Sequence, residues 1–169
     1  MTTLATAAPD RAAIDAIVAR HRDLLERAVR ANRERTYFSA FPESPSPRVY
    51  GEGAADAGRQ AFEALLNRRF DLGQPATAGW VATERSPWGP ELGIEYPTPD
   101  VDRLLPALRA AIPAWRDAGP LARAALCVEM LTRINAASFE MAYAVMHTSG
   151  QAFVMAFQAG GPHAQDRAL

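Results

Sequence analysis

Most of this chain carries apolar residues at helical spacing, and only one segment alternates apolar and polar residues as a strand does. The helical pattern occupies residues 14–28, 62–70, 101–115, 126–134 and 141–146. The alternating residues are Leu92, Ile94 and Tyr96, which follow a short apolar run at 80–83 and a Ser-Pro-Trp-Gly turn at 86–89. The sequence therefore predicts a mainly α fold with one β-hairpin.

Several residues mark where these helices begin or end. Asp10 is the predicted N-cap of the first helix, and Ser138 is that of a later one. Gly119 and Pro120 separate two consecutive helices, because proline is tolerated in a first turn. Gly150 is the predicted C-terminal stop of the helix that follows Ser138.

Residues 38–53 are predicted to form a loop, because Pro42, Pro45 and Pro47 disfavour a regular helix. We interpret this segment as an ordered strap held by aromatic residues. These residues are Tyr37, Phe38, Phe41 and Tyr50. The alternative is that the P-x-x-P spacing docks in the aromatic groove of a partner.

Length and composition indicate one ordinary globular domain. The 169 residues are 49% hydrophobic and 22% charged, unlike a disordered chain. Basic and acidic residues nearly cancel, 18 − 19 = −1, so no net field favours nucleic acid or a membrane surface. The apolar runs are too short to cross a bilayer, and residues 1–10 lack the pattern of a signal sequence. We expect a cytoplasmic protein.

The chain contains no lysine and a single cysteine, Cys127. Without lysine it cannot form a Schiff base or build the usual phosphate-binding loop. Cys127 cannot form an internal disulfide, which fits a reducing compartment. Because it lies within a helical pattern with no histidine near it in sequence, we predict a small core residue and not a nucleophile.

Gly51, Gly53 and Gly58 imitate a dinucleotide-binding loop. The spacing differs from that motif, however, and no apolar strand precedes it. Glu52 would also place a negative charge against the phosphates. We interpret the segment as a turn followed by a helix start.

Four other residues include the types found in metal and hydrolase sites: His147, Ser149, His163 and Asp166. Nothing in their spacing favours either chemistry. His21 is predicted to be a partly buried, hydrogen-bonded histidine. The arginines predicted to be solvated, without forming an RNA-binding patch, are Arg33, Arg35, Arg68 and Arg69. The residues alone therefore predict no catalytic, cofactor-binding or metal-binding site.

Residues 80–153 resemble the N-terminal part of the aldehyde dehydrogenase superfamily. The runs that carry the resemblance are Ser86-Pro87-Trp88-Gly89, Glu91-Leu92-Gly93, Asp100-Val101-Asp102 and Ala110-Ala111-Ile112-Pro113-Ala114-Trp115. Arg123 also lies where the family carries an arginine in its next helix. Thr148 and Gln151 depart from the family, which has Glu and Lys around the run that matches Ser149 and Gly150.

From about Phe38 onward the chain is similar to one branch of that superfamily, the phenylacetic acid degradation protein PaaN family. The matching runs are FPESPSP at 41–47, YGEG at 50–53, PAWRDAGP at 113–120, AVMHT at 144–148 and AFQAGGPHAQDR at 156–167. The combination of these runs is more specific than any one of them.

The resemblance implies that the chain is the incomplete N-terminal helical part of an aldehyde dehydrogenase-like α/β fold. Residues 1–79 would be a helical extension with the proline-rich strap, and residues 80–169 the truncated start of the dehydrogenase domain. The implied activity is NAD(P)-dependent oxidation of a semialdehyde in phenylacetate ring-opening catabolism, by a homo-oligomer when full length. The family's nucleophilic cysteine, its base and its cofactor-binding residues come later than Leu169, so none is carried over.

We therefore expect a fragment that is inactive alone and binds neither NAD nor NADP by itself. Its expected partner is the remainder of the dehydrogenase polypeptide, without nucleic acid or membrane. Its apolar stripe of Leu104, Leu108, Ile112 and Trp115 should then stay partly exposed. Two alternatives remain open: a stand-alone, non-catalytic helical interaction module derived from the family, and a thiol site formed by Cys127 and His147.

Overall fold

The computed structural model describes residues 10–71 and 73–169, so the signal-sequence prediction for residues 1–10 lies almost wholly outside them. In these residues it contains eight helices and one two-stranded antiparallel sheet, which confirms the mainly α fold with one hairpin. The elements are α1 (Arg11–Glu34), α2 (Pro47–Tyr50), α3 (Ala54–Glu63), β1 (Thr77–Val81), β2 (Tyr96–Pro99), α4 (Val101–Asp117), α5 (Gly119–Ala136), α6 (Ser138–Ser149), α7 (Phe153–Gly160) and α8 (Pro162–Ala168). None of the described helices is both long and apolar enough to span a membrane.

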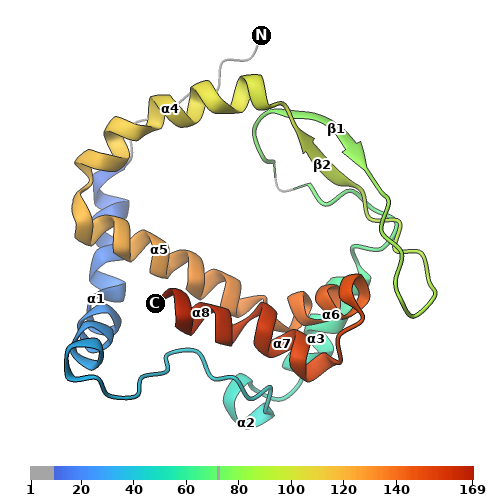
Figure 1. The fold of residues 1–169 in the computed structure, drawn as a ribbon, viewed down its shortest axis with the longest axis horizontal. Helices are drawn as coiled ribbons and strands as arrows, with labels where there is room; N and C mark the ends of the chain where they lie inside the picture. Colours follow the sequence, from blue (N-terminus) through green and yellow to red (C-terminus); the bar gives the residue numbers. More distant parts are fainter. Residues whose placement is uncertain (1–9, 72) are drawn as a thin grey trace.

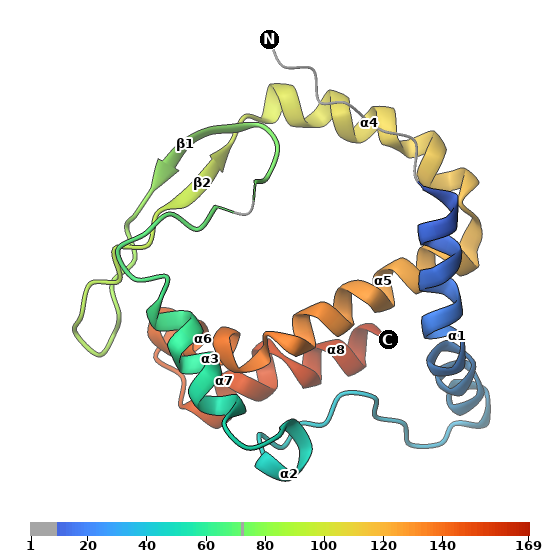
Figure 2. The same cartoon turned by 180° about the vertical axis from the view of Figure 1, so that it is seen from behind.

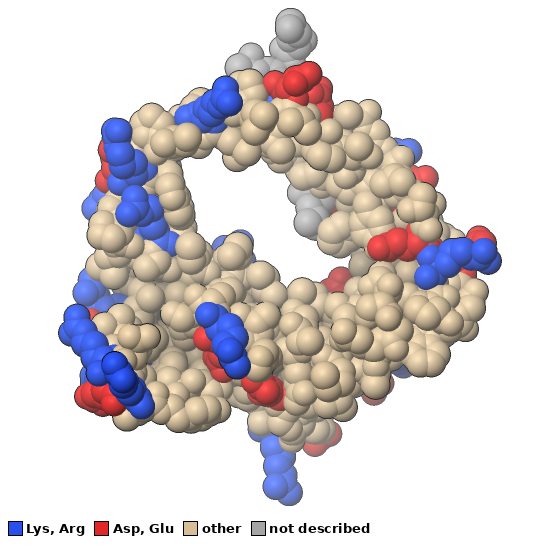
Figure 3. All heavy atoms as spheres, viewed as in Figure 1, with Lys and Arg blue, Asp and Glu red and all other residues tan. Residues whose placement is uncertain are grey.

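The elements form a ring (Figures 1 and 2). α4 connects the β1–β2 sheet to α5, α1 packs against α5, and α3 packs against α6. In the space-filling view an opening remains at the centre of the ring, and most atoms that border it in that view belong to uncharged residues (Figure 3). The chain thus buries its apolar residues at the rim of the ring and not in a central core.

Two apolar clusters hold the rim together, and α6 contributes to both. The buried members of the first are Phe139, Ala142, Ala156 and Phe157. Tyr50 meets the rings of Phe139 and Phe157 edge-on, with centroids 5.4 Å apart in each pair. The buried members of the second are Phe62, Leu92 and Ile94, against which Tyr143 of α6 also packs.

Three of the four predicted helix boundaries are confirmed. Asp10 caps α1 by accepting a hydrogen bond from the Ala12 amide at 3.0 Å. Gly119 and Gly150 take positive φ angles of 82° and 78° where helices end or begin, which glycine adopts without strain.

The prediction that Ser138 is an N-cap is wrong. α5 continues to Ala136, so Ala137 alone separates it from α6, and Ser138 is already the first helical residue. A capping serine needs an extended backbone outside the helix, and this tight connection leaves no room for one. The buried hydroxyl of Ser138 has no hydrogen-bond partner in the structure.

The second strand lies later than the alternating pattern predicted. β1 pairs with Tyr96–Pro99, while Leu92 and Ile94 are 2% and 3% exposed in the second apolar cluster. The backbone around them bonds to residues 67–70 instead of β1, through Asn67 N to Leu92 O at 3.0 Å and Phe70 N to Glu95 O at 2.9 Å. The alternating pattern therefore predicted correctly that Leu92 and Ile94 are buried, but it did not predict which segment pairs with β1. The turn at 86–89 is confirmed, with the Gly89 amide donating to the Ser86 carbonyl at 2.9 Å.

The strap at residues 38–53 is not entirely a loop, because it contains α2. Pro47 opens this short helix, where proline costs little, and Ser46 caps it through a 3.2 Å bond from the Arg48 amide. Phe41 is buried as predicted, but Tyr37 is 92% exposed and anchors nothing.

A carboxylate that the sequence did not single out for this role fixes the strap. Asp166 of α8 accepts hydrogen bonds from the Ser39 hydroxyl at 2.6 Å and from the amides of Ala40 and Phe41 at 2.9 and 3.0 Å. These backbone amides would otherwise lack a partner in a segment without regular structure. Asp166 thereby ties the strap to the far end of the chain.

α3 approaches α6 so closely that only glycine fits at position 58. A Cβ at Gly58 would lie 2.3 Å from the Cβ of Phe139 and 2.8 Å from the amide nitrogen of Glu140. α3 ends at Glu63, so the predicted helical residues Leu65, Leu66 and Phe70 pack against the second cluster from beyond the helix. The contact between α3 and α6 joins the two predicted parts, residues 1–79 and residues 80–169. The proposed boundary between these parts falls within β1. That division stays a prediction.

We predict that Gly58→Ala destabilises the chain by about 1–3 kcal/mol, because the added methyl group meets backbone that cannot move aside. The free energy of unfolding in urea measures this. Gly79→Ala is the matched control, because nothing lies within 4 Å of a Cβ at Gly79. Equal stabilities for the two variants would contradict the close approach of α3 and α6.

Candidate functional site

Cys127 is exposed on α5, so its predicted place in the core is wrong. The buried residues of α5 are Ala122, Ala125, Val128, Glu129 and Leu131. Met130, which lies within the helical pattern predicted at 126–134, is 54% exposed. The buried face of α5 packs on α1 through small residues and a carboxylate.

His147 hydrogen-bonds within a cluster that fastens the 86–89 turn to α6. Its Nδ1 lies 3.0 Å from Ser86 Oγ, and its ring stacks on Phe62 with centroids 5.1 Å apart. Trp88 adds a bond from its indole nitrogen to the Met146 carbonyl at 3.2 Å. Ser86 is only 5% exposed, so this serine–histidine pair offers no hydroxyl to a substrate in solution. The cluster does not contain Cys127, and the structure provides no support for a thiol site.

The other candidates for metal or hydrolase chemistry are separated. Ser149 donates to the Val145 carbonyl of its own helix at 2.6 Å. His163 pairs with Glu43 of the strap at 2.8 Å, and Asp166 accepts the three strap bonds described above. Over residues 10–71 and 73–169 no group of three or more His, Cys, Asp or Glu side chains is placed to hold a metal ion.

The glycine-containing segment does not fit a dinucleotide. Gly51 and Gly53 adopt φ angles of 94° and 81° in the turn between α2 and α3, and Gly58 is buried against Phe139. Helix packing therefore accounts for the glycines, and the interpretation as a turn and helix start is confirmed. The exposed Arg69 stacks over Trp80 at 5.0 Å and pairs with Glu95 at 2.6 Å.

The main electrostatic centre of the structure lies between α1 and α5. His21 is 5% exposed and its Nε2 lies 2.7 Å from Glu129 Oε2, which confirms the predicted hydrogen-bonded histidine. Arg20 and Arg133 bond to the same carboxylate at 2.8 and 2.9 Å. Hydrogen bonds from His21, from Arg133 and then from Arg20 lower the pKa of Glu129 to about 2, against partial burial, which raises it. One carboxylate on α5 thus binds two side chains of α1.

Tyrosine hydroxyls near the apolar clusters stay protonated at neutral pH. Burial, together with a hydrogen bond to and charge on Glu84, raises the pKa of Tyr96 to about 12. Burial also raises the pKa of Tyr50, opposed by its hydrogen bond with Asn135. Neither tyrosine can act as a base under ordinary conditions.

The most unusual surface is the apolar face of α4, a helix without a buried residue. The exposed members of this face are Val101, Leu105, Leu108, Ile112 and Trp115, each between 45% and 58% exposed. The prediction that Leu108, Ile112 and Trp115 stay partly exposed is confirmed, and Leu104, the fourth residue of the predicted stripe, is half-buried. Exposed apolar residues that share one face of a helix often mark an interaction surface.

A solved structure shares this arrangement: the crystal structure of an NAD-dependent aldehyde dehydrogenase from Burkholderia multivorans. The two superpose with a TM-score of 0.83 at 53% sequence identity, over 90% of this chain and 27% of that chain. The chain has the fold of part of an aldehyde dehydrogenase. It spans about a quarter of the length of that dehydrogenase. No protein-family model matches the chain, and the comparison with curated proteins gives no match.

We predict that Glu129→Gln destabilises the chain at neutral pH and that the difference from wild type shrinks as the pH falls. The folded-state pKa of Glu129, about 2, lies below the ordinary value of 4.5. Its contribution is therefore complete above pH 4.5 and is lost as the pH falls toward 2. Urea unfolding between pH 2 and pH 7 measures this. The control is Glu26→Gln, because Glu26 is an exposed partner of Arg22 at 3.9 Å. A pH-independent difference for Glu129→Gln would refute the assignment.

Proposed function

We propose that this chain is the N-terminal part of a PaaN-like, NAD(P)-dependent aldehyde dehydrogenase that oxidises a semialdehyde in phenylacetate ring-opening catabolism. The observation that carries the proposal is the similarity to the Burkholderia dehydrogenase, at 53% identity over 90% of this chain. The PaaN-like runs of the sequence support the narrower assignment. In this proposal the chain supplies structure to the enzyme and no catalytic group.

The uncovered surfaces support a role within a larger polypeptide. The apolar face of α4 and the mostly uncharged border of the ring opening are both left in contact with water (Figure 3). Covering the exposed half of one such side chain contributes roughly 1 kcal/mol, which favours packing of the remainder of the dehydrogenase on this face. That remainder is the proposed partner, and a homo-oligomer is the proposed assembly of the whole.

In this proposal the chain has a positioning role within the enzyme. The Glu129 contacts fix α1 on α5, and Asp166 fixes the strap on α8. Nicotinamide chemistry and the attacking thiol belong, in this proposal, to the part of the enzyme that follows Leu169. We assign no step of the oxidation to residues of this chain.

We predict that the native gene product in a cell extract is several times heavier than 18.3 kDa, because the chain aligns with 27% of the solved dehydrogenase. Intact mass spectrometry tests this. The heavier polypeptide should reduce NAD⁺ or NADP⁺ in the presence of an aldehyde, and the 169-residue chain should not. A native species of 18.3 kDa would instead support the stand-alone interaction module.

We also predict that the paired change Leu108→Gln and Ile112→Gln alters the stability of the 169-residue chain by less than about 0.5 kcal/mol, because both side chains are more than half exposed. In the longer polypeptide the same change should cost about 2 kcal/mol or more. Urea unfolding of both proteins measures the contrast. Phe157→Ala is the control, since this fully buried ring should cost about 3–5 kcal/mol in both. Equal effects of the paired change in the two proteins would count against a covered α4.

A further inference from the structure

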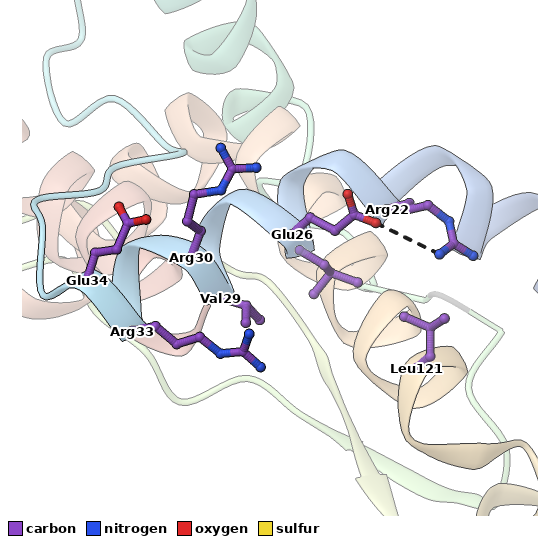
Figure 4. A pocket seen from close by; sticks show the side chains of 8 residues that line it. Arg22, Glu26, Val29, Arg30, Arg33, Glu34 and Leu121 are labelled. Atoms are coloured by element: carbon purple, nitrogen blue, oxygen red, sulfur yellow. Dashed lines mark ion pairs between the residues drawn. The ribbon is translucent and has the colours of Figure 1, made fainter.

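A groove follows the C-terminal half of α1. It consists of two adjoining hollows of about 520 Å³ and 390 Å³, which share Leu25, Val29 and Arg33. The first reaches Leu121 at the start of α5, and the second reaches Leu169 after α8. Figure 4 shows Val29 and Leu121 on neighbouring helices, with arginine side chains around them.

The groove combines an apolar floor with a charged border, in which three arginines, Arg22, Arg30 and Arg33, stand beside Glu26 and Glu34. Val29 and Leu121 are 48% and 45% exposed, so roughly half of each side chain can still be covered. Arg22 lies 3.9 Å from Glu26, whereas Arg30 and Arg33 form no ion pair with any described residue. An occupant that fits this surface presents apolar side chains next to carboxylates.

α8 leads into this groove. Its last turn is still helical, with the Leu169 amide donating to the Gln165 carbonyl at 3.0 Å. Leu169 itself lines the second hollow with residues of α1, and the end of α8 lies beside α1 in both ribbon views (Figures 1 and 2). Polypeptide joined to Leu169 is therefore held at a high effective concentration at the groove.

We propose that the groove receives the polypeptide that follows Leu169. Its apolar side chains would cover Val29 and Leu121, and its carboxylates would pair with Arg30 and Arg33. The groove extends along α1 from Arg22 to Arg33, about 16 Å at 1.5 Å per residue, so about three turns of helix cover it. This inference rests on the proposed function, in which the chain is part of a longer polypeptide.

Thiol labelling in the groove tests the proposal. Cys127→Ser first removes the thiol of residues 1–169, and Val29→Cys then introduces one on the groove floor, whose labelling is followed on the peptide that contains residue 29. We expect maleimide to label it about 10-fold or more slowly in the longer native polypeptide than in the 169-residue chain. Tyr37→Cys is the control, because Tyr37 is 92% exposed and belongs to neither hollow, so its labelling should match in the two proteins.

The outcomes separate this proposal from the proposed function. If the longer polypeptide oxidises aldehydes but labels at the rate of the 169-residue chain, the groove is open and only this proposal is wrong. If slow labelling speeds up on dilution, a second copy fills the groove, and the proposal is also wrong. A native product of 18.3 kDa overturns both. Leu121→Cys, on the other side of the groove, gives the same readout if Val29→Cys does not fold.

Discussion

The contact between α3 and α6 at Gly58 closes the ring. A hydrogen atom in place of a side chain lets the backbone of α3 reach Phe139 and Glu140, which brings Phe62 beside Leu92 and Ile94. The segment between α3 and α6 contains the hairpin, α4 and α5. The contact at Gly58 fixes where this segment starts. At the other end α5 is held by α1 through the Glu129 carboxylate. Two local contacts thus define a large open shape.

These two contacts explain how the chain can be ordered at its rim while the apolar face of α4 remains in water. Phe139 and Phe157 complete their packing inside the chain, together with Tyr50 from the strap. The α4 residues, although they follow a helical pattern as those of α6 do, are not buried by any part of the chain that the structure describes. An amphipathic pattern predicts that a face will be buried, but it does not say whether the burying surface lies in the same chain.

The sequence predicted most of the helices and three caps, because these depend on local spacing and backbone conformation. It misplaced what depends on tertiary contacts: Cys127 lies outside the buried face of α5, and β2 lies after the alternating residues. Ser138 failed as a cap because the helix before it continued too far. No local signal marked Glu129 or Asp166 as centres of hydrogen bonding, because most of their partners lie 108 to 127 residues away. The exception is Arg133, which lies one helical turn after Glu129.

The bonds of Asp166 to the strap also set an order of events during synthesis. The amides of Ala40 and Phe41 leave the ribosome long before Asp166, 126 and 125 residues later, supplies their acceptor. At about 5–20 residues per second, they wait on the order of 6–25 s with only water as a partner. α1 faces the same delay before Glu129 emerges. Until then, the strap and α1 lack these tertiary partners and are accessible to proteases and chaperones in the cell.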